Sequence, residues 1–158
     1  MNDKPKRQKR KKGDIVQIDL GDGFHSYARV LEEAMFAFYD SRTANDLPVD
    51  QIISCRILFS IAVMNHAVMR GRWKIVGHIP LEEALVVSRP RFIQDALKPE
   101  SFSIYERGAI RPATREECIG LECAAVWDPT HAEDRIRDHY LGRKNKWLES
   151  LKIKERST

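Results

Sequence analysis

The stretch that decides the fold is residues 13–40, GDIVQIDLGDGFHSYARVLEEAMFAFYD. Apolar and polar residues alternate between Val16 and Leu20, which is typical of a β-strand with one buried face. Residues 21–23, Gly-Asp-Gly, tolerate positive φ angles, so we expect the chain to reverse there. The pattern then predicts a return strand over residues 24–31 and a third strand over residues 35–39, and together these strands make an antiparallel meander.

A meander of three short strands cannot cover its own apolar face, so the downstream chain must supply the rest of the core. Six apolar residues at period two predict one long, buried strand over residues 52–63, a segment rich in β-branched residues. A further strand is expected over residues 73–79. It ends at Pro80, because proline has no donor for the ladder. Two short apolar runs predict a hairpin made of residues 92–93 and 102–105.

The clearest helix signal lies near the C-terminus. Asp128 offers a side-chain acceptor at the N-cap position, and a proline follows at the first helical position. Apolar residues at i, i+4 and i+8 place one stripe of a helix over residues 129–141 against the sheet. On the outside of this helix we expect Glu133 and Arg137 to form a favourable i, i+4 pair. A further helix is predicted within residues 144–153.

These patterns predict an α+β fold. Its main part is an antiparallel curved β-sheet or a partly open SH3-like barrel, with one or two C-terminal α-helices packed on it. A length of 158 residues suits one domain with a sizeable core, which we assign to residues 13–158.

The charge of the chain is concentrated in its first residues. Residues 1–12 contain seven Lys or Arg and one Asp, a local charge of +6. Because the whole chain carries +4, the remainder carries −2. A like-charged run of this kind is typical of a disordered tail. The charge favours a solubilising terminal extension over a nucleic-acid or targeting arm. A nucleic-acid binder normally carries Lys and Arg on its folded body, so the basic tail is the one part of this chain that offers a contact with nucleic acid.

No residue pattern points to catalysis. The sequence has no P-loop, GxGxxG, GxSxG or HExxH motif. Three cysteines, an odd number, indicate reduced thiols instead of a disulfide framework, and their spacing does not match a zinc ligand set. We therefore expect no enzyme, no cofactor and no metal. The chain has no apolar run of about 18 residues and no secretory signal, so we expect a cytoplasmic protein without a membrane span.

Acidic residues recur in and beside the meander. Asp22, Glu32, Glu33 and Asp40 fall on expected turns or strand ends. If these carboxylates gather on one rim, they make an anionic patch that can dock on a basic protein cleft. The alternative interpretation is that they are ordinary solvated turn residues.

The quoted stretch resembles the start of the immunity protein 26 family of bacterial polymorphic toxin systems. The matching positions are Gly13-Asp14-Ile15, Leu20, Asp22-Gly23, Tyr27, Arg29-Val30-Leu31 and Phe38-Tyr39-Asp40. The later segment WKIVGHIPL, residues 73–81, is similar to an internal strand of the same family that ends in proline.

This resemblance implies a non-enzymatic antidote that binds and neutralises a cognate toxin, often a nuclease. It supplies no catalytic residues, and we expect the toxin to contact Asp22, Glu32, Glu33 and Asp40. Two alternatives stay open at this point. The opening segment also resembles the SH3-like barrel of MazF/PemK-type toxins, which are endoribonucleases, although no matching arginine-plus-Ser/Thr arrangement follows. The other alternative is a small-barrel nucleic-acid-binding protein.

Overall fold

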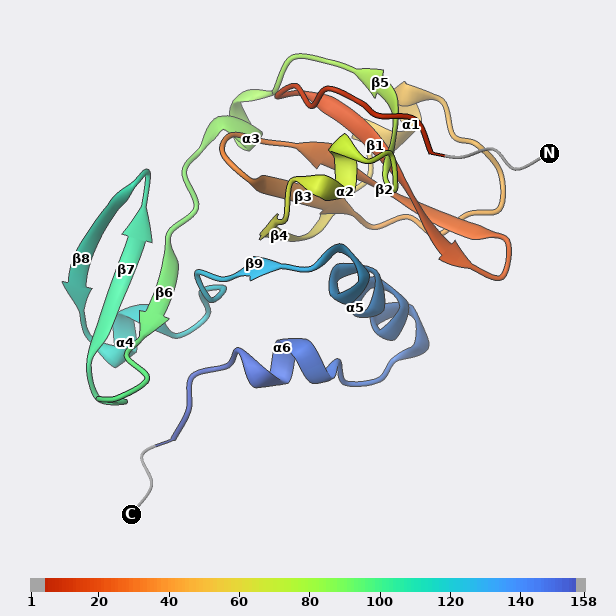
Figure 1. Cartoon of the computed structure of the whole chain (residues 1–158). Helices are drawn as coiled ribbons and strands as arrows, with labels where there is room; N and C mark the ends of the chain where they lie inside the picture. The colour runs from red at the N-terminus through yellow and green to blue at the C-terminus, as the bar shows by residue number, and fades with distance from the viewer. Residues whose placement is uncertain (1–4, 156–158) are drawn as a thin grey trace. The chain divides into compact units, whose positions relative to one another are not determined.

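The computed structural model describes residues 5–155 (Figure 1). Contacts between Cα atoms divide the chain into two compact units, Met1–Val86 with Val126–Arg143, and Val87–Ala125 with Lys144–Thr158. Each unit has its own β-sheet. The assignment of residues 13–158 to a single domain stays a prediction.

The first unit holds a six-stranded sheet with the strand order β5-β1-β2-β3-β4-β9. Its strands are β1 (Asp14–Gly21), β2 (Phe24–Val30), β3 (Met35–Tyr39), β4 (Ile57–Val63), β5 (Lys74–His78) and β9 (Val126–Trp127). Its helices are α1 (Val49–Ile53), α2 (His66–Met69), α3 (Glu83–Val86) and α5 (Pro129–Leu141). Every strand pair is antiparallel except β4 with β9. Within the described residues the sheet is open, with β5 and β9 at its edges, and the predicted α+β fold is confirmed.

The predicted meander forms as expected. β1 pairs with β2, and β2 pairs with β3, in antiparallel register. The reversal between β1 and β2 uses Gly21, Asp22 and Gly23, whose φ angles are 85°, 54° and 81°. Glycine adopts such angles without a steric penalty, and aspartate is among the residues that tolerate them best. The local sequence therefore determines this turn.

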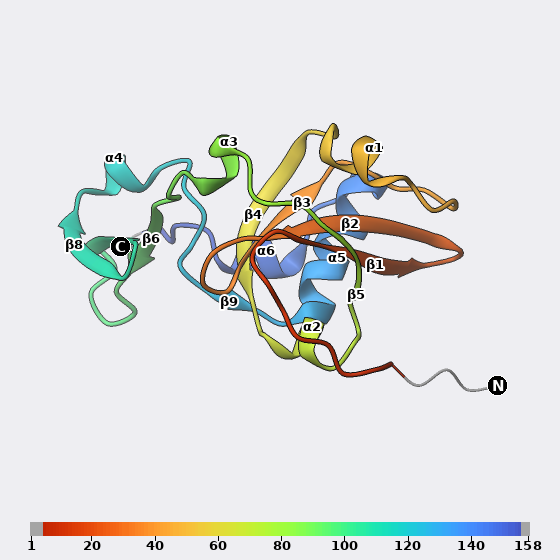
Figure 2. The same ribbon diagram turned by 90° about the horizontal axis from the view of Figure 1, so that it is seen from above.

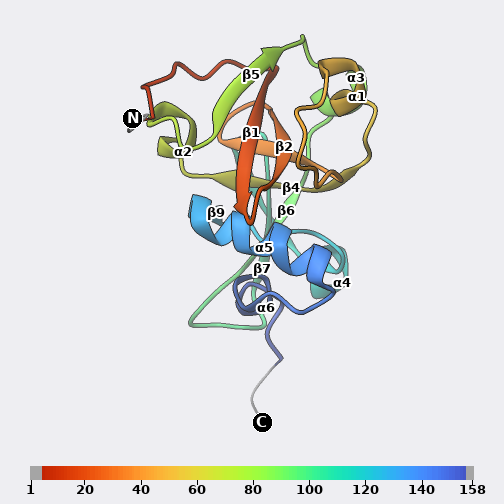
Figure 3. The same ribbon diagram turned by 90° about the vertical axis from the view of Figure 1, so that its right-hand side faces the viewer.

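One face of the six-stranded sheet carries an aromatic core. Phe38 stacks on Phe59 with ring centroids 4.8 Å apart. Trp73 meets Phe36 and Phe38 edge-on, with centroid distances of 5.3 and 5.7 Å. Helix α5 lies along this face (Figure 3), and its Ile136 is fully buried. The predicted helix over residues 129–141 is thus confirmed, with the same bounds.

The opposite face is covered by α1 and α3, and a buried arginine ties α3 to the sheet. Arg29 is fully buried. Its guanidinium donates to the Tyr39 hydroxyl at 3.1 Å and to the Glu82 carboxylate at 3.1 and 3.3 Å. It also donates to the backbone carbonyls of residues 13, 79 and 80. Because an unpaired buried guanidinium would be costly, these acceptors hold the segment before α3 in place.

The prediction of one long strand over residues 52–63 was wrong in its first half. Residues Val49–Ile53 form α1, and the strand β4 begins only at Ile57. Ile52 is fully buried in a cluster with Ile15, Tyr27 and Tyr39. A short helix can therefore bury the same apolar residues that the period-two pattern assigned to a strand, because packing across the sheet overrides local propensity.

The second unit is built on a three-stranded antiparallel sheet of β6 (Arg91–Gln94), β7 (Phe102–Glu106) and β8 (Ala109–Ala113). It also contains the helices α4 (Arg115–Cys118) and α6 (Lys146–Ser150). The predicted hairpin corresponds to β6 and β7. The core consists of Phe92, Phe102, Ile104 and Cys118. The helix predicted within residues 144–153 is present but short, and none of its residues is fully buried.

The basic N-terminal segment has defined contacts where the structure describes it. Residues 5–12 run beside α2 (Figure 2) and reach β5. The backbone N–H of Gln8 donates to the Met69 carbonyl at 3.0 Å, and the Gln8 side chain bonds to Ile75 N–H at 2.8 Å. Of the segment predicted to be disordered, residues 1–4 lie outside the described residues.

Candidate functional site

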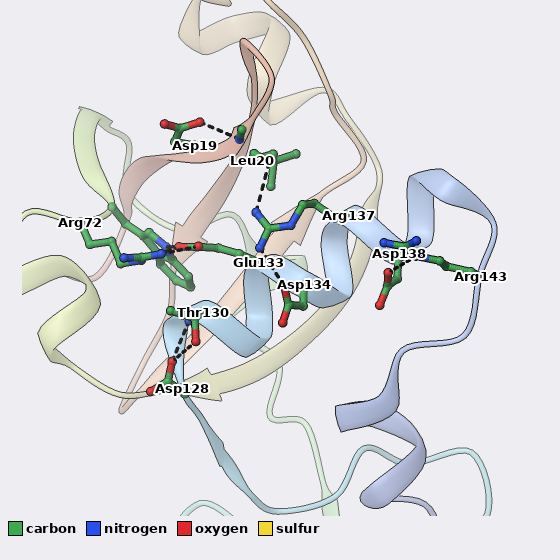
Figure 4. A network of polar contacts seen from close by, with 12 residues as sticks. Asp19, Leu20, Arg72, Asp128, Thr130, Glu133, Asp134, Arg137, Asp138 and Arg143 are labelled. Atoms are coloured by element: carbon green, nitrogen blue, oxygen red, sulfur yellow. Dashed lines mark hydrogen bonds and ion pairs between the residues drawn. The ribbon is translucent and has the colours of Figure 1, made fainter.

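A charged groove lies between the tip of the β1–β2 hairpin, the start of β5 and the first turns of α5, all within the first unit. Its volume is about 710 Å³, and Asp19, Arg72, Asp128, Glu133 and Arg137 are among the residues that line it. Figure 4 shows the polar contacts among these side chains. A smaller hollow of about 340 Å³ shares Asp19 and Arg72 with the groove. We call the two together the hairpin groove.

Glu133 is the centre of the groove. Its carboxylate is almost completely buried, with 3% of the residue exposed. It accepts from Arg72 Nε at 2.8 Å and Arg72 Nη2 at 2.7 Å, and from the indole Nε1 of Trp73 at 2.8 Å. The hydrogen bonds to Glu133 raise the pKa of the Arg72 guanidinium above its ordinary value. A bidentate arginine pair of this kind fixes both side chains in direction.

The expectation of an exposed Glu133–Arg137 pair is therefore wrong. Glu133 points at β5, and Arg137 bonds elsewhere. Arg137 Nη1 donates to the Leu20 carbonyl at 3.1 Å, and its Nη2 lies 2.8 Å from Asp134 Oδ1. Arg137 thus joins α5 to the end of β1 (Figure 4). Both side chains are used to attach the helix to the sheet.

The start of α5 forms the floor of the groove. Asp128 Oδ1 accepts from the backbone N–H of Thr130 at 2.8 Å and from its hydroxyl at 2.6 Å. This is the N-cap that the sequence predicts. The hydrogen bonds from Thr130 lower the pKa of the Asp128 carboxyl below its usual range. The carboxylate therefore remains charged at neutral pH and stabilises the first turn.

The hairpin tip forms the rim of the groove. Asp19 Oδ1 accepts from the backbone N–H of Gly21 at 2.8 Å, which holds the turn. Asp22 follows at the apex with a positive φ angle, and it is exposed. Its carboxylate forms no ion pair with any residue of the described chain. Asp22 is therefore an exposed negative charge on a turn that the hydrogen bond from Gly21 to Asp19 holds.

The four carboxylates predicted to contact a partner are not brought together. Asp22 and the Glu32-Glu33 pair lie at opposite ends of β2, whose seven residues span about 23 Å. Glu32 forms an ion pair with Lys12 at 3.2 Å. Glu33 lies beside it in the same turn, with a positive φ angle. These two residues line a hollow that also contains Lys9 and Arg10, so the turn is not an anionic patch.

Asp40, the fourth predicted residue, is held inside its own network at the end of β3. It accepts from the Tyr140 hydroxyl at 2.7 Å and from Arg56 Nε at 2.8 Å. These hydrogen bonds, the one from Tyr140 first, lower the pKa of the Asp40 carboxyl. Asp40 is therefore a structural link between β3 and α5, and its charge is largely compensated.

The groove residues that sequence reasoning missed are Arg72 and Glu133. Helical spacing contained a signal for Glu133, because residues 129, 132, 133 and 136 fall at i, i+3, i+4 and i+7. That spacing places Glu133 on the buried stripe. No local pattern identifies Arg72 as its partner, since the two residues lie 61 positions apart.

The side chains of the groove suit binding better than proton transfer. Glu133 already accepts three hydrogen bonds, and Asp128 is occupied as a helix cap. Among residues 5–155, no group of three or more His, Cys, Asp or Glu side chains is placed to hold a metal ion. In the same part of the chain, no helix is long and apolar enough to cross a membrane. The groove is a preorganised polar surface.

Comparison with known proteins supports one family. The family model described as immunity protein 26 matches residues 11–103, more than half of the chain. The matched region contains the whole meander, Arg29 and Arg72, whereas α5 lies beyond it. No curated protein and no solved structure matches the chain. The resemblance seen in residues 13–40 is confirmed, and the chain belongs to the immunity protein 26 family.

Proposed function

We propose that this chain neutralises a cognate bacterial toxin, of the nuclease class, by binding to it in the cytoplasm, and that it catalyses no reaction itself. Membership of the immunity protein 26 family supports the role of an antidote. The observation that carries the proposal is the set of hydrogen bonds and ion pairs made by the side chains that line the hairpin groove. Four of its charged side chains, Arg72, Asp128, Glu133 and Arg137, are engaged with one another or with neighbouring groups, which gives the groove a fixed arrangement of donors and acceptors.

We assign the toxin contact to the hairpin end of the sheet, where Asp22 and the hairpin groove lie side by side. Of the four carboxylates predicted from the sequence, Asp22 is exposed and has no ion-pair partner in residues 5–155. Glu32 and Asp40 are already paired with Lys12 and Arg56. An uncompensated charge at the rim of a preformed hollow contributes most to the rate of association with an oppositely charged partner.

The mechanism needs no bond to be made or broken. A nuclease must expose a cleft that attracts phosphate, and a cleft of this kind is basic. A carboxylate on a stiff turn can enter such a cleft and exclude the substrate. The groove beside it offers fixed donors and acceptors for the rim of the partner, which gives specificity.

The decisive experiment tests this chain against candidate toxin domains encoded in the neighbourhood of its gene. Co-expression of the chain should restore growth, and the purified proteins should form a complex. Asp22→Asn is the informative variant, because asparagine tolerates the same positive φ angle while the charge is lost. We expect a two- to fivefold slower association, about the effect of one rim charge, together with a weaker salt dependence.

Glu32→Gln is the matched control, since it neutralises a carboxylate at the opposite end of β2. It should leave the association rate unchanged. The opposite result, a rate that responds to Glu32→Gln and not to Asp22→Asn, would place the contact at the other end of the sheet. Robust cleavage of RNA by the purified chain alone would reject the antidote function in favour of the MazF/PemK-like alternative.

A further inference from the structure

In the N-terminal arm, residues 5–12, the stretch 7–11 alternates between side chains that hold it to the first unit and side chains that face solvent. Gln8 and Arg10 are partly buried, whereas Arg7, Lys9 and Lys11 are exposed. Alternation of this kind is the geometry of an extended segment lying on a surface. The arm is therefore attached through one side only.

Gln8 attaches the arm to the free edge of β5. Its side-chain amide donates to the carbonyls of Val68 and Trp73 at 2.9 and 2.8 Å and accepts from the N–H of Ile75 at 2.8 Å. The contacts to Trp73 and Ile75 are those that the backbone of a neighbouring strand would make. The amide thus satisfies edge groups that would otherwise be open to another chain.

Arg10 holds one end of the arm, and the other end lies close against the backbone of Gly71. Arg10 donates to the carbonyls of Leu31 and Met35 at 3.3 and 3.2 Å, and its guanidinium lies 4.7 Å from the ring centroid of Phe36. At the other end, a Cβ atom on Gly71 would lie 2.3 Å from the carbonyl oxygen of Lys6. Only glycine permits this close approach of two backbones.

The exposed side carries cations, and one of them, Lys9, lines the same hollow as Glu32 and Glu33. Arg7, Lys9 and Lys11 form no side-chain hydrogen bond and no ion pair with any residue of the described range. Arg70, in the loop beside the arm, is exposed and equally unpaired. Alternate residues of an extended chain lie about 6.6 Å apart. The arm therefore presents three cations in a row, and a fourth cation flanks them.

We propose that this row, Arg7, Lys9 and Lys11, is a phosphate-binding strip for nucleic acid. The strip is rich in lysine, a residue that is depleted at protein–protein interfaces but is a standard phosphate ligand. No exposed aromatic side chain accompanies the three cations, so the contact reads the backbone and not the bases. Because the arm is already docked, less conformational entropy is lost on binding. This inference does not depend on the antidote function.

The test is fluorescence anisotropy of the full-length protein with labelled single-stranded and duplex DNA of about 20 nucleotides, at 50 and 200 mM salt. Three phosphate contacts on duplex DNA predict a salt slope of about −2.7, and hence about a 40-fold loss of affinity between these concentrations. The triple variant Arg7→Gln, Lys9→Gln, Lys11→Gln should lose most of this slope and bind at least tenfold more weakly at 50 mM salt.

The matched control removes the same charges from the second unit, with Lys98→Gln, Arg107→Gln and Lys144→Gln. It should retain most of the affinity. Equal losses in both triple variants, or no binding by the natural protein at 50 mM salt, would overturn the proposal. A loss confined to toxin binding would overturn it as well, because the strip would then belong to a protein interface.

Gln8→Ala tests the docking itself, since it releases the arm from β5 without changing its charge. We expect about threefold weaker binding with an unchanged salt slope. Affinity equal to that of the natural protein would show that the docked conformation contributes nothing.

Discussion

Removal of the Glu133 carboxylate is the sharpest test of the structure. Glu133→Ala deletes the acceptor for the indole N–H of Trp73, a fully buried residue. It also deletes the partner of Arg72, whose side chain is 51% exposed. The two consequences differ in size because one donor has no access to water and the other has.

The magnitude follows from these exposures. A buried donor left without an acceptor costs about 1–3 kcal/mol. The arginine can regain hydration, so its share is about 0.5–1 kcal/mol, the range of a surface ion pair. The sum is about 1.5–4 kcal/mol, a large part of the stability of a typical domain. Glu133→Gln keeps an oxygen acceptor for Trp73 and should cost about half as much.

Equilibrium urea unfolding, followed by tryptophan fluorescence, measures both variants. We expect the midpoint to fall while the slope m stays constant, as for a change in native stability alone. Glu116→Ala, an exposed helical glutamate, is the control and should stay within about 0.5 kcal/mol of the natural protein. The reasoning is refuted if Glu133→Ala behaves like this control, or if Glu133→Gln is as damaging as Glu133→Ala.

Three further predictions address other parts of the chain. Arg29→Met leaves the carbonyls of residues 13, 79 and 80 without their donor, whereas the Glu82 side chain, which is 45% exposed, can regain hydration. Each unpaired buried acceptor costs about 1–3 kcal/mol, so we expect about 3–5 kcal/mol lower stability and faster proteolysis of residues 79–86; a loss below about 1 kcal/mol would contradict this. Folding lowers the pKa of the Asp128 carboxyl, so its charged form contributes fully to the free energy of unfolding above about pH 4. This stabilisation disappears as the pH falls through the folded-state pKa. Asp128→Asn should accordingly flatten the acid limb of a stability–pH curve, and an unchanged limb would argue against the cap. Burial raises the pKa of the Cys118 thiol, so this cysteine should react slowly with a disulfide reagent at pH 7 until the protein unfolds, whereas immediate labelling would contradict its burial.

Local sequence patterns correctly predicted the elements that depend only on neighbouring residues. The turn at residues 21–23 follows from residues that accept positive φ angles, and α5 follows from its N-cap, its proline and its apolar stripe. Helix α4 also begins with a local cap, because the Thr114 side chain accepts from the backbone N–H of Glu117. Each of these features depends on atoms within a few residues of one another.

Local sequence patterns gave wrong predictions where the residues in contact lie far apart in the chain. Spacing on α5 suggested that Glu133 pairs with Arg137, yet the tertiary structure pairs it with Arg72 and Trp73. A period-two run suggested a strand at residues 52–56, yet packing against Ile15 made part of it a helix. In both cases the partner that fixed the outcome lies far away in the chain, so the local sequence contained no signal for it.

The amino-acid sequence by itself thus determined the meander and the capped C-terminal helix, because short-range sterics and periodicity specify them. The family followed from a resemblance of residues 13–40, which the family model confirms. Only the tertiary structure decided which charges remain free. It separated Asp22 from Glu32 by the length of β2, paired Glu32 with Lys12, and placed the basic arm against β5 through Gln8. Charge compensation depends on distances across the fold, and composition contains no information about those distances.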